Sequence, residues 1–184
     1  IIPVELKKGV CAEDEHPRVD TTLEKLSSLR PAFGPTGTVT AGNASGINDG
    51  AAMVLLASET AVAKHGLPSR ARIAGAAFVG CDPALMGMGP VFAIRAVLSD
   101  LDWDLSKVPV VEINEAFASQ AVACKNELML SEEQWNTWGG GIALGHPIGC
   151  SGTRVLVTLL HRMEQANAQR GVASLCIGGG MGIA

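Results

Sequence analysis

Short apolar runs alternate with helical patterns from residue 47 onward, and this alternation limits the fold more than any other feature of the chain. The runs that we expect to form strands are Ala51–Ala57, Ala71–Gly80, Val108–Ile113, Val172–Ile177 and a last strand that begins at Met181. The segments that we expect to form helices are Ser58–His65, Val91–Leu98, Glu115–Leu128 and a long helix that opens at Ser151. Several strands are apolar throughout, which is typical of a sheet that is buried on both faces. The sequence therefore predicts an α/β fold.

The first 46 residues have a different texture. We expect, in order, a short strand over Ile1–Leu6, a polar loop over Lys7–Arg18, a helix over Thr21–Leu29 and a loop over Pro35–Gly46. The composition changes near Gly46, so we divide the chain into domains at residues 1–46 and 47–184. The chain begins without Met and stops inside an expected strand, so we expect it to be part of a longer protein.

Charge and composition exclude several classes of function. The net charge is −4 and no basic stretch occurs, so neither nucleic acid nor a membrane is an expected partner. No run is long and apolar enough to span a bilayer. The five cysteines form no CxxC pair and no cluster with histidine at zinc-ligand spacing, so we expect no metal site. Reduced thiols fit the cytoplasm, with a mitochondrial or peroxisomal matrix as the alternative.

Two glycine-rich stretches each surround one reactive side chain. His146 lies within Gly139–Gly152, and Cys176 is followed closely by Gly178–Gly180. Glycine lets a ligand approach the backbone, and free N–H groups beside an imidazole and a thiol suit acyl chemistry on a thioester. Each residue taken alone leaves a second interpretation open. His146 could be a packing residue in a loop, and Cys176 a small buried side chain at a strand end.

Three further segments carry polar or flexible side chains at the ends of expected elements. Asn114 follows the strand Val108–Ile113, at the strand end where α/β sheets bind ligands, although it could simply cap the next helix. Asn43–Ala52 holds small polar residues that could contact a ligand or merely turn the chain. Met86–Pro90 is a glycine turn with two methionines, which are suited to lining a pocket.

Together, and in this order, these blocks resemble the thiolase family. The resemblance covers nearly the whole chain and rests on NASGINDGAA at Asn43–Ala52, NEAFA at Asn114–Ala118, GHPIGCSG at Gly145–Gly152 and CIGGGMG at Cys176–Gly182. The chain looks like the C-terminal half of a thiolase, preceded by the tail of the family's loop domain. The first and last blocks look most like the short-chain members, the acetyl-CoA acetyltransferases. The resemblance implies a thiolase-like fold, whose mixed sheet is covered by helices on both faces.

The resemblance also implies catalytic roles at four positions. His146 would activate the nucleophilic cysteine and line an oxyanion hole, in which Asn114 would hold a water molecule. Cys176 would be the acid/base that exchanges a proton with the α-carbon of acetyl-CoA or with the CoA thiolate. The N–H group of Gly178 would help to form a second oxyanion hole. The implied reaction is the condensation of two acetyl-CoA molecules, or the thiolytic cleavage of acetoacetyl-CoA.

The coenzyme A thioester enters this reaction as the substrate, and no separate cofactor is implied. Ser45 would touch the pantetheine arm of CoA. The side chains implied to surround that arm are Phe33, Met86, Ala116 and Phe117. The full-length protein would be a homo-oligomer, either a dimer or a tetramer.

Two features depart from the family's pattern. The family's nucleophile, a cysteine of the N-terminal half, has no counterpart here, because Cys11 lies in a polar stretch that does not match its context. Trp138 stands where the family usually has a second asparagine, and its indole could alter the pocket edge. We therefore expect no turnover from these 184 residues alone. A longer-chain 3-ketoacyl-CoA thiolase and a non-catalytic CoA-binding remnant stay open as alternatives.

Overall fold

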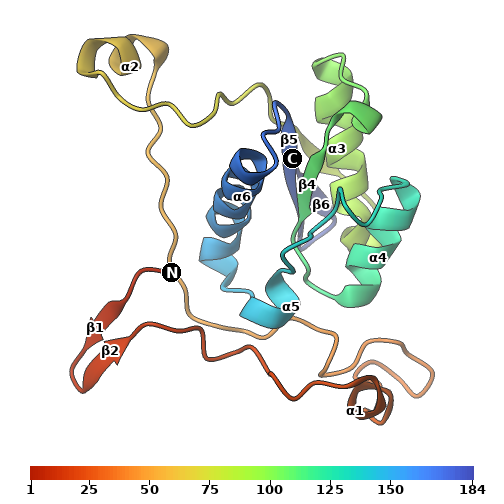
Figure 1. The fold of residues 1–184 in the computed structure, drawn as a ribbon. Coiled ribbons are helices and arrows are strands. Elements are labelled where there is room, and N and C mark those ends of the chain that lie inside the picture. The colour runs from red at the N-terminus through yellow and green to blue at the C-terminus, as the bar shows by residue number, and fades with distance from the viewer.

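A four-stranded mixed sheet forms the centre of the computed structural model, which describes residues 1–184. The spatial order is β3 (Phe78–Gly80), β6 (Met181–Ile183), β5 (Gly171–Ile177) and β4 (Val110–Ile113). β4 and β5 run parallel, whereas β6 is antiparallel to both of its neighbours. Figure 1 shows α3 and α4 on one face of the sheet and α6 on the other. The predicted α/β fold, with a mixed sheet between helices, is confirmed.

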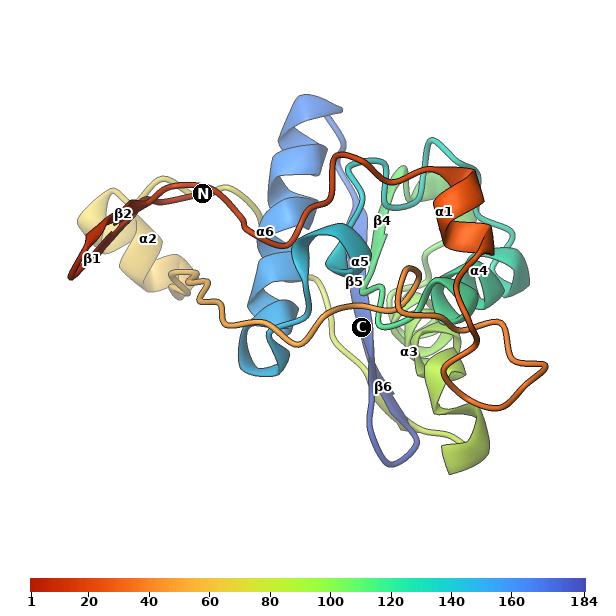
Figure 2. The ribbon, with the colours of Figure 1, turned by 90° about the horizontal axis from the view of Figure 1, so that it is seen from below.

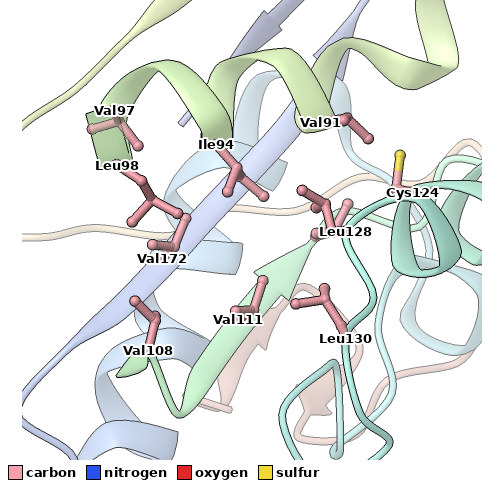
Figure 3. Packing of buried hydrophobic residues seen from close by; sticks show 11 residues of the cluster. Val91, Ile94, Val97, Leu98, Val108, Val111, Cys124, Leu128, Leu130 and Val172 are labelled. Atoms are coloured by element: carbon pink, nitrogen blue, oxygen red, sulfur yellow. The ribbon is translucent and has the colours of Figure 1, made fainter. Parts of the chain in front are cut away.

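The main apolar core lies between the sheet and the helices α3 (Gly89–Asp100) and α4 (Ala118–Glu127). Figure 3 shows Ile94 of α3 and Val111 of β4 pointing into the same layer. Burying one such side chain contributes about 1.5–3 kcal/mol. The other buried members of this cluster are Val91, Val97, Leu98, Val108, Ile113, Cys124, Leu128, Leu130 and Val172.

The opposite face is covered by α6 (Ile148–Gln165), which contacts both β4 and β5. Val155 and Leu159 of α6 are buried there, as their helical spacing predicts. The face also holds a buried ion pair, in which Nη1 of Arg162 lies 2.6 Å from Oε1 of Glu112. Arg162 also donates to the carbonyl oxygen of Val111, so its buried guanidinium has more than one hydrogen-bond partner.

The remaining helical elements are short and connect the larger ones. They are the 3₁₀ helices η1 (Pro83–Met88) and η2 (Leu105–Lys107) and the single turn α5 (Gly141–Leu144). Two helix starts differ from the sequence prediction by three residues. The helix expected from Glu115 begins at Ala118, and the helix expected from Ser151 begins at Ile148. No helix of the chain has the length and apolar character needed to cross a bilayer.

The N-terminal segment is mostly extended and carries four small elements. They are β1 (Val4–Leu6), β2 (Gly9–Cys11), α1 (Leu23–Ser27) and α2 (Glu59–His65). Both views show β1, β2 and α2 away from the sheet, on the side of α6 (Figures 1 and 2). The strand and the two helices expected in this part are present. The prediction of a loop over residues 7–18 is wrong at β2, which pairs antiparallel with β1 through a turn at Lys7 and Lys8. Gly9, the first residue of β2, has φ of 129°.

The predicted buried strand Ala51–Ala57 does not form. Its apolar side chains face solvent, with Met53 90% and Leu55 82% exposed. A strand needs a neighbour that accepts and donates its backbone hydrogen bonds, and no other segment of the chain pairs with these residues. The predicted strand Ala71–Gly80 shrinks to β3 for the same reason, because β6 is short and pairs only with its last residues.

Candidate active site

Asn114 and Cys176 lie at the same edge of the sheet because β4 and β5 run parallel. The register pairs Ile113 with Ser174, and the N–H of Asn114 donates to the carbonyl oxygen of Ser174 at 2.9 Å. Asn114 thus extends the ladder by one residue, and Cys176 follows Ser174 on β5. The carboxyl ends of parallel strands are where α/β sheets place ligand-binding groups. The structure therefore brings these two predicted residues to one edge.

His146 reaches this edge from the turn between α5 and α6. Gly145 has φ of 95°, a conformation that favours glycine, and the N–H of His146 donates to the carbonyl oxygen of Gly46 at 2.8 Å. The imidazole Nε2 lies 3.4 Å from Nδ2 of Asn114. On its other side, Nδ1 lies 2.5 Å from Oγ of Ser151. His146 is therefore held at both ring nitrogens, and its side chain meets that of Asn114.

The glycine loop before His146 is fastened by Glu115. One carboxylate oxygen accepts from the N–H of Ile142 at 3.2 Å, and the other from Nδ2 of Asn136 at 3.3 Å. Asn136 also pairs with the N–H and C=O of Ile113, at 2.9 and 2.8 Å. A Cβ at Gly140 would lie 2.9 Å from the Glu115 carboxyl carbon, so a side chain there would displace this carboxylate from its position. These bonds tie the loop to the end of β4.

Burial shifts the pKa values of His146 and Cys176 in opposite directions. Burial, and then the nearby positive charge of Arg154, lowers the pKa of His146, so the imidazole is neutral at neutral pH and can accept a proton. Burial raises the pKa of the Cys176 thiol, so this cysteine keeps its proton and can act as an acid. A base and an acid at one strand edge are the parts that proton-transfer chemistry needs.

Gly178 lies in the hairpin turn between β5 and β6, next to Cys176. The turn Gly178–Gly180 uses φ values of 89° at Gly179 and 91° at Gly180. A Cβ at Gly178 would meet nothing within 4 Å, so the space beside its backbone is open. At Gly180, by contrast, a Cβ would lie 2.4 Å from the carbonyl oxygen of Cys81. The turn is thus anchored at Gly180 and accessible at Gly178.

The residues expected to contact CoA lie on two segments that meet beside Asn114. Oγ of Ser45 donates to the carbonyl oxygen of Ala116 at 2.9 Å, and Ala44 forms a β-bridge with Phe117. The rings of Phe33 and Phe117 meet edge to face, with centroids 6.3 Å apart. These contacts bring Ser45, Phe33, Ala116 and Phe117 together. Met86 lies in η1, which packs against α4 and β5.

The sequence pattern did not single out four residues that hold this site. Ser151 of α6 contacts His146, and Arg154 of the same helix contacts Asn114. Glu115 and Asn136 hold the glycine loop. Ser151 and Arg154 are three residues apart and so share one face of α6, a spacing that could have placed them beside His146. Trp138 is half-exposed on the turn between Asn136 and Gly140.

None of the five cysteines occupies the position of a nucleophile next to His146. The ring nitrogens of His146 face Asn114 and Ser151, and no thiol is hydrogen-bonded to them. The chain also holds no cluster of three or more histidine, cysteine, aspartate or glutamate side chains with the geometry to bind a metal ion.

Two thiolase family models together match nearly the whole chain. The family description "Thiolase, N-terminal domain" matches residues 1–60, and "Thiolase, C-terminal domain" matches residues 67–184. A β-ketoadipyl-CoA thiolase of Pseudomonas aeruginosa is 52% identical over all of this chain and 47% of its own length. An acetyl-CoA acetyltransferase of the same species is 55% identical over 93% of this chain and 44% of its own length.

Solved structures show the same likeness. The crystal structure of the Bacillus anthracis acetyl-CoA acetyltransferase matches all of this chain and 48% of its own, with a TM-score of 0.94 and 48% identity. Human mitochondrial 3-ketoacyl-CoA thiolase in complex with CoA matches 98% of this chain and 46% of its own, with a TM-score of 0.92 and 46% identity. The chain spans about half the length of the curated relatives that it matches. On these matches, the chain belongs to the thiolase family.

Proposed function

We propose that this chain supplies the acid–base half of a thiolase active site, and that the complete enzyme forms or cleaves acetoacetyl-CoA. The observation that carries the proposal is the pairing of His146 with Asn114 at the strand edge that also bears Cys176. A neutral imidazole, a primary amide and a protonated thiol are the groups that thiolytic cleavage of a 3-ketoacyl thioester requires. The five free cysteines support a reducing compartment for the protein.

In the cleavage direction, the nucleophile is a cysteine thiol outside these 184 residues. His146 accepts its proton at Nε2, and the thiolate forms a bond to the 3-keto carbon of the substrate. The bond between the α-carbon and that carbonyl carbon breaks, and its electron pair passes to the α-carbon as an acetyl-CoA enolate. Cys176 donates the proton that converts the enolate into acetyl-CoA. The CoA thiol then gives its proton to the Cys176 thiolate, and its sulfur forms a bond to the acyl carbon. The bond between that carbon and the nucleophilic sulfur breaks, and the leaving thiolate takes back the proton held by His146.

The hydrogen-bond donors near His146 stabilise the negative oxygen that develops in each step. Nδ2 of Asn114 lies beside Nε2 of the imidazole, so an oxygen atom or a water molecule bound there would contact both nitrogens. The open space beside Gly178 suits a second thioester oxygen, because no side chain blocks its backbone. The pantetheine arm would pass over the segment where Ser45 and Phe117 meet.

A longer-chain 3-ketoacyl-CoA is the second candidate substrate. The relatives support both readings, because a β-ketoadipyl-CoA thiolase and an acetyl-CoA acetyltransferase match this chain at 52% and 55% identity. Acyl-chain preference depends on the residues around the acyl chain, whereas His146 and Cys176 act at the reacting atoms. The chemistry proposed for His146 and Cys176 is the same in both cases.

A chimera tests the proposed function. The first half of the Pseudomonas aeruginosa acetyl-CoA acetyltransferase is joined to Ile1 of this chain, and cleavage is measured for acetoacetyl-CoA, β-ketoadipyl-CoA and a series of longer 3-ketoacyl-CoA substrates. We expect thiolysis that is fastest with acetoacetyl-CoA, and a loss of about a hundredfold or more on His146→Ala. A maximum at a longer substrate selects the second candidate.

The isolated chain provides the comparison. We expect the purified 184 residues to show no cleavage of acetoacetyl-CoA, because no thiol stands next to His146. A folded chimera that binds CoA in calorimetry but cleaves no substrate would contradict the proposed activity and favour a CoA-binding remnant. Clear turnover by the isolated chain would contradict the view that it holds only half of the site.

A further inference from the structure

Arg154 is a charged side chain beside the candidate site to which the proposed reaction gives no role. It lies partly buried on α6, and its Nη2 donates to Oδ1 of Asn114 at 3.3 Å. Its other terminal nitrogen, Nη1, lies 3.4 Å from Oγ1 of Thr158 one turn further along the helix. Asn114 is itself 1% exposed, and its carbonyl oxygen has no other partner. The guanidinium and His146 therefore lie at opposite ends of the same amide.

Arg154, Asn114, His146 and Ser151 form a chain of hydrogen bonds. The chemistry of Arg154 determines which group donates and which accepts at each link. A guanidinium can only donate, so the atom of Asn114 that faces it must be the carbonyl oxygen. The amide nitrogen then faces His146 Nε2 and donates to it, which requires that Nε2 carry no proton. A neutral imidazole has its one proton on the other nitrogen, so Nδ1–H donates to Oγ of Ser151. The hydroxyl proton of Ser151 remains free for the carbonyl oxygen of Pro147, 3.0 Å away.

The direction of donation matters because free histidine in water favours the opposite tautomer, with the proton on Nε2. In that form Nε2 could not accept a proton, and the amide of Asn114 would have to turn its oxygen toward the ring. The turned amide would then present its N–H₂ group to a guanidinium, which has no acceptor. Nη2 of the partly buried guanidinium would lose its acceptor, which is costly for a charged donor, so Arg154 disfavours the turned arrangement.

We propose that Arg154 is a positioning residue that fixes the amide of Asn114 and thereby holds His146 in the tautomer whose Nε2 carries no proton. This inference rests on the proposed function for its consequence, since a lone pair on Nε2 is what the base of a thiolase needs. Arg154 acts through Asn114 and touches neither the substrate nor the reacting atoms.

Nuclear magnetic resonance of the 184-residue chain with ¹⁵N-labelled histidine tests the proposal. The chemical shifts of the ring nitrogens report which of them carries the proton, and His146→Gln assigns the signals of His146 among the four histidines. At mildly alkaline pH we expect the Nδ1–H tautomer in the wild type. Loss of one hydrogen bond to a charged group in Arg154→Met should shift the tautomer ratio toward Nε2–H by about tenfold or more.

Two variants separate positioning from general loosening of the fold. Arg154→Lys keeps a positive, donor-only group and should retain the wild-type tautomer. Arg95→Met makes the same side-chain change at an exposed arginine of α3 that pairs with Glu127 of α4, and should leave His146 unchanged. If Arg154→Met does not fold, Arg154→Gln replaces it, because a glutamine amide can present either an oxygen or a nitrogen to Asn114 and should also lose the preference.

The wild-type tautomer in folded Arg154→Met or Arg154→Gln would overturn the proposal, as would an equal shift in Arg95→Met. These spectra require neither substrate nor nucleophile. A chimera without thiolase activity would count against the proposed function, whereas an unchanged tautomer would count against the role of Arg154, so the two failures are distinguishable.

Discussion

Replacing Gly182 by alanine should destabilise the fold because β6 and the start of α3 are in backbone contact. A Cβ at Gly182 would lie 2.2 Å from the carbonyl oxygen of Gly89 and 2.3 Å from its carbonyl carbon. These atoms belong to the first residue of a packed helix and cannot rotate away. Ordinary contact begins at 3.4 Å, so β6 and α3 must separate by about 1 Å. Overpacking costs about 1–3 kcal/mol, and a displaced backbone places this site near the upper end.

The same displacement should reach the candidate site. Gly182 lies opposite Cys176 in the ladder between β5 and β6, and the turn that contains Gly178 joins the two strands. A shift of β6 therefore moves the hairpin that carries both residues. We expect Gly182→Ala to lower the free energy of unfolding and to increase the rate at which the Cys176 thiol reacts with iodoacetamide.

Urea unfolding followed by circular dichroism measures the first effect, and Gly152→Ala is the matched control. Gly152 is exposed within α6, and a Cβ there would meet nothing within 4 Å. Alanine at this position should raise the free energy of unfolding by up to about 1 kcal/mol, because glycine is a poor helix former. A Gly182→Ala variant as stable as the wild type would refute the reasoning from backbone contact.

Three further experiments test other parts of the structure. Asn136→Ala removes the side-chain partners of the N–H and C=O of Ile113 and should cost about 2–4 kcal/mol in urea unfolding; a loss near zero would contradict this pairing. Burial raises the pKa of Cys124 to about 11, so mass spectrometry should find its alkylation slower than that of Cys176, and the reverse order would count against the packing. Burial lowers the pKa of His146, so the unfolded chain binds this proton more tightly, and stability should fall as the pH drops below 6.5. In His146→Gln that part of the pH dependence of the urea midpoint should vanish; an unchanged dependence would assign it to other groups.

Local patterns predicted the elements whose ends are determined by their own residues. The side chain of Ser58 caps α2 by accepting from the N–H of Ala61, and Gly66 ends the helix with φ of 59°. Both residues are standard signals for a helix start and stop. The strand Val172–Ile177 was equally clear, because it is a short apolar run bounded by glycine on both sides.

Elements that depend on distant partners were not predictable in the same way. The run Ala51–Ala57 is apolar, but apolar composition indicates a need for burial and does not identify the neighbouring strand. The helix after Asn114 starts late because Ser45 donates to the carbonyl oxygen of Ala116 and the N–H of Ala118 donates to Asn43. Those bonds join segments about 70 residues apart, and no local pattern contains them.

The candidate site was also predictable only in the parts that depend on local sequence. The glycine context of His146 and Cys176 indicated reactive positions, although each alone left a packing explanation open. Cys176 and Asn114 are brought together by the parallel pairing of β4 with β5, which places Asn114 next to Ser174, and His146 joins them through its contact with Asn114. Arg154 could not be assigned from its sequence context, because its importance depends on which face of α6 meets the end of β4.

The central claim is that His146 and Asn114 act as one unit at the strand edge, and a double-mutant cycle in the chimera tests it most directly. The turnover number for acetoacetyl-CoA cleavage is measured for the parent chimera, for His146→Ala, for Asn114→Ala and for the double variant. Groups that act together lose activity non-additively. We predict that the double variant is scarcely slower than His146→Ala. Losses that multiply independently, or a His146→Ala variant with full activity, would contradict the account.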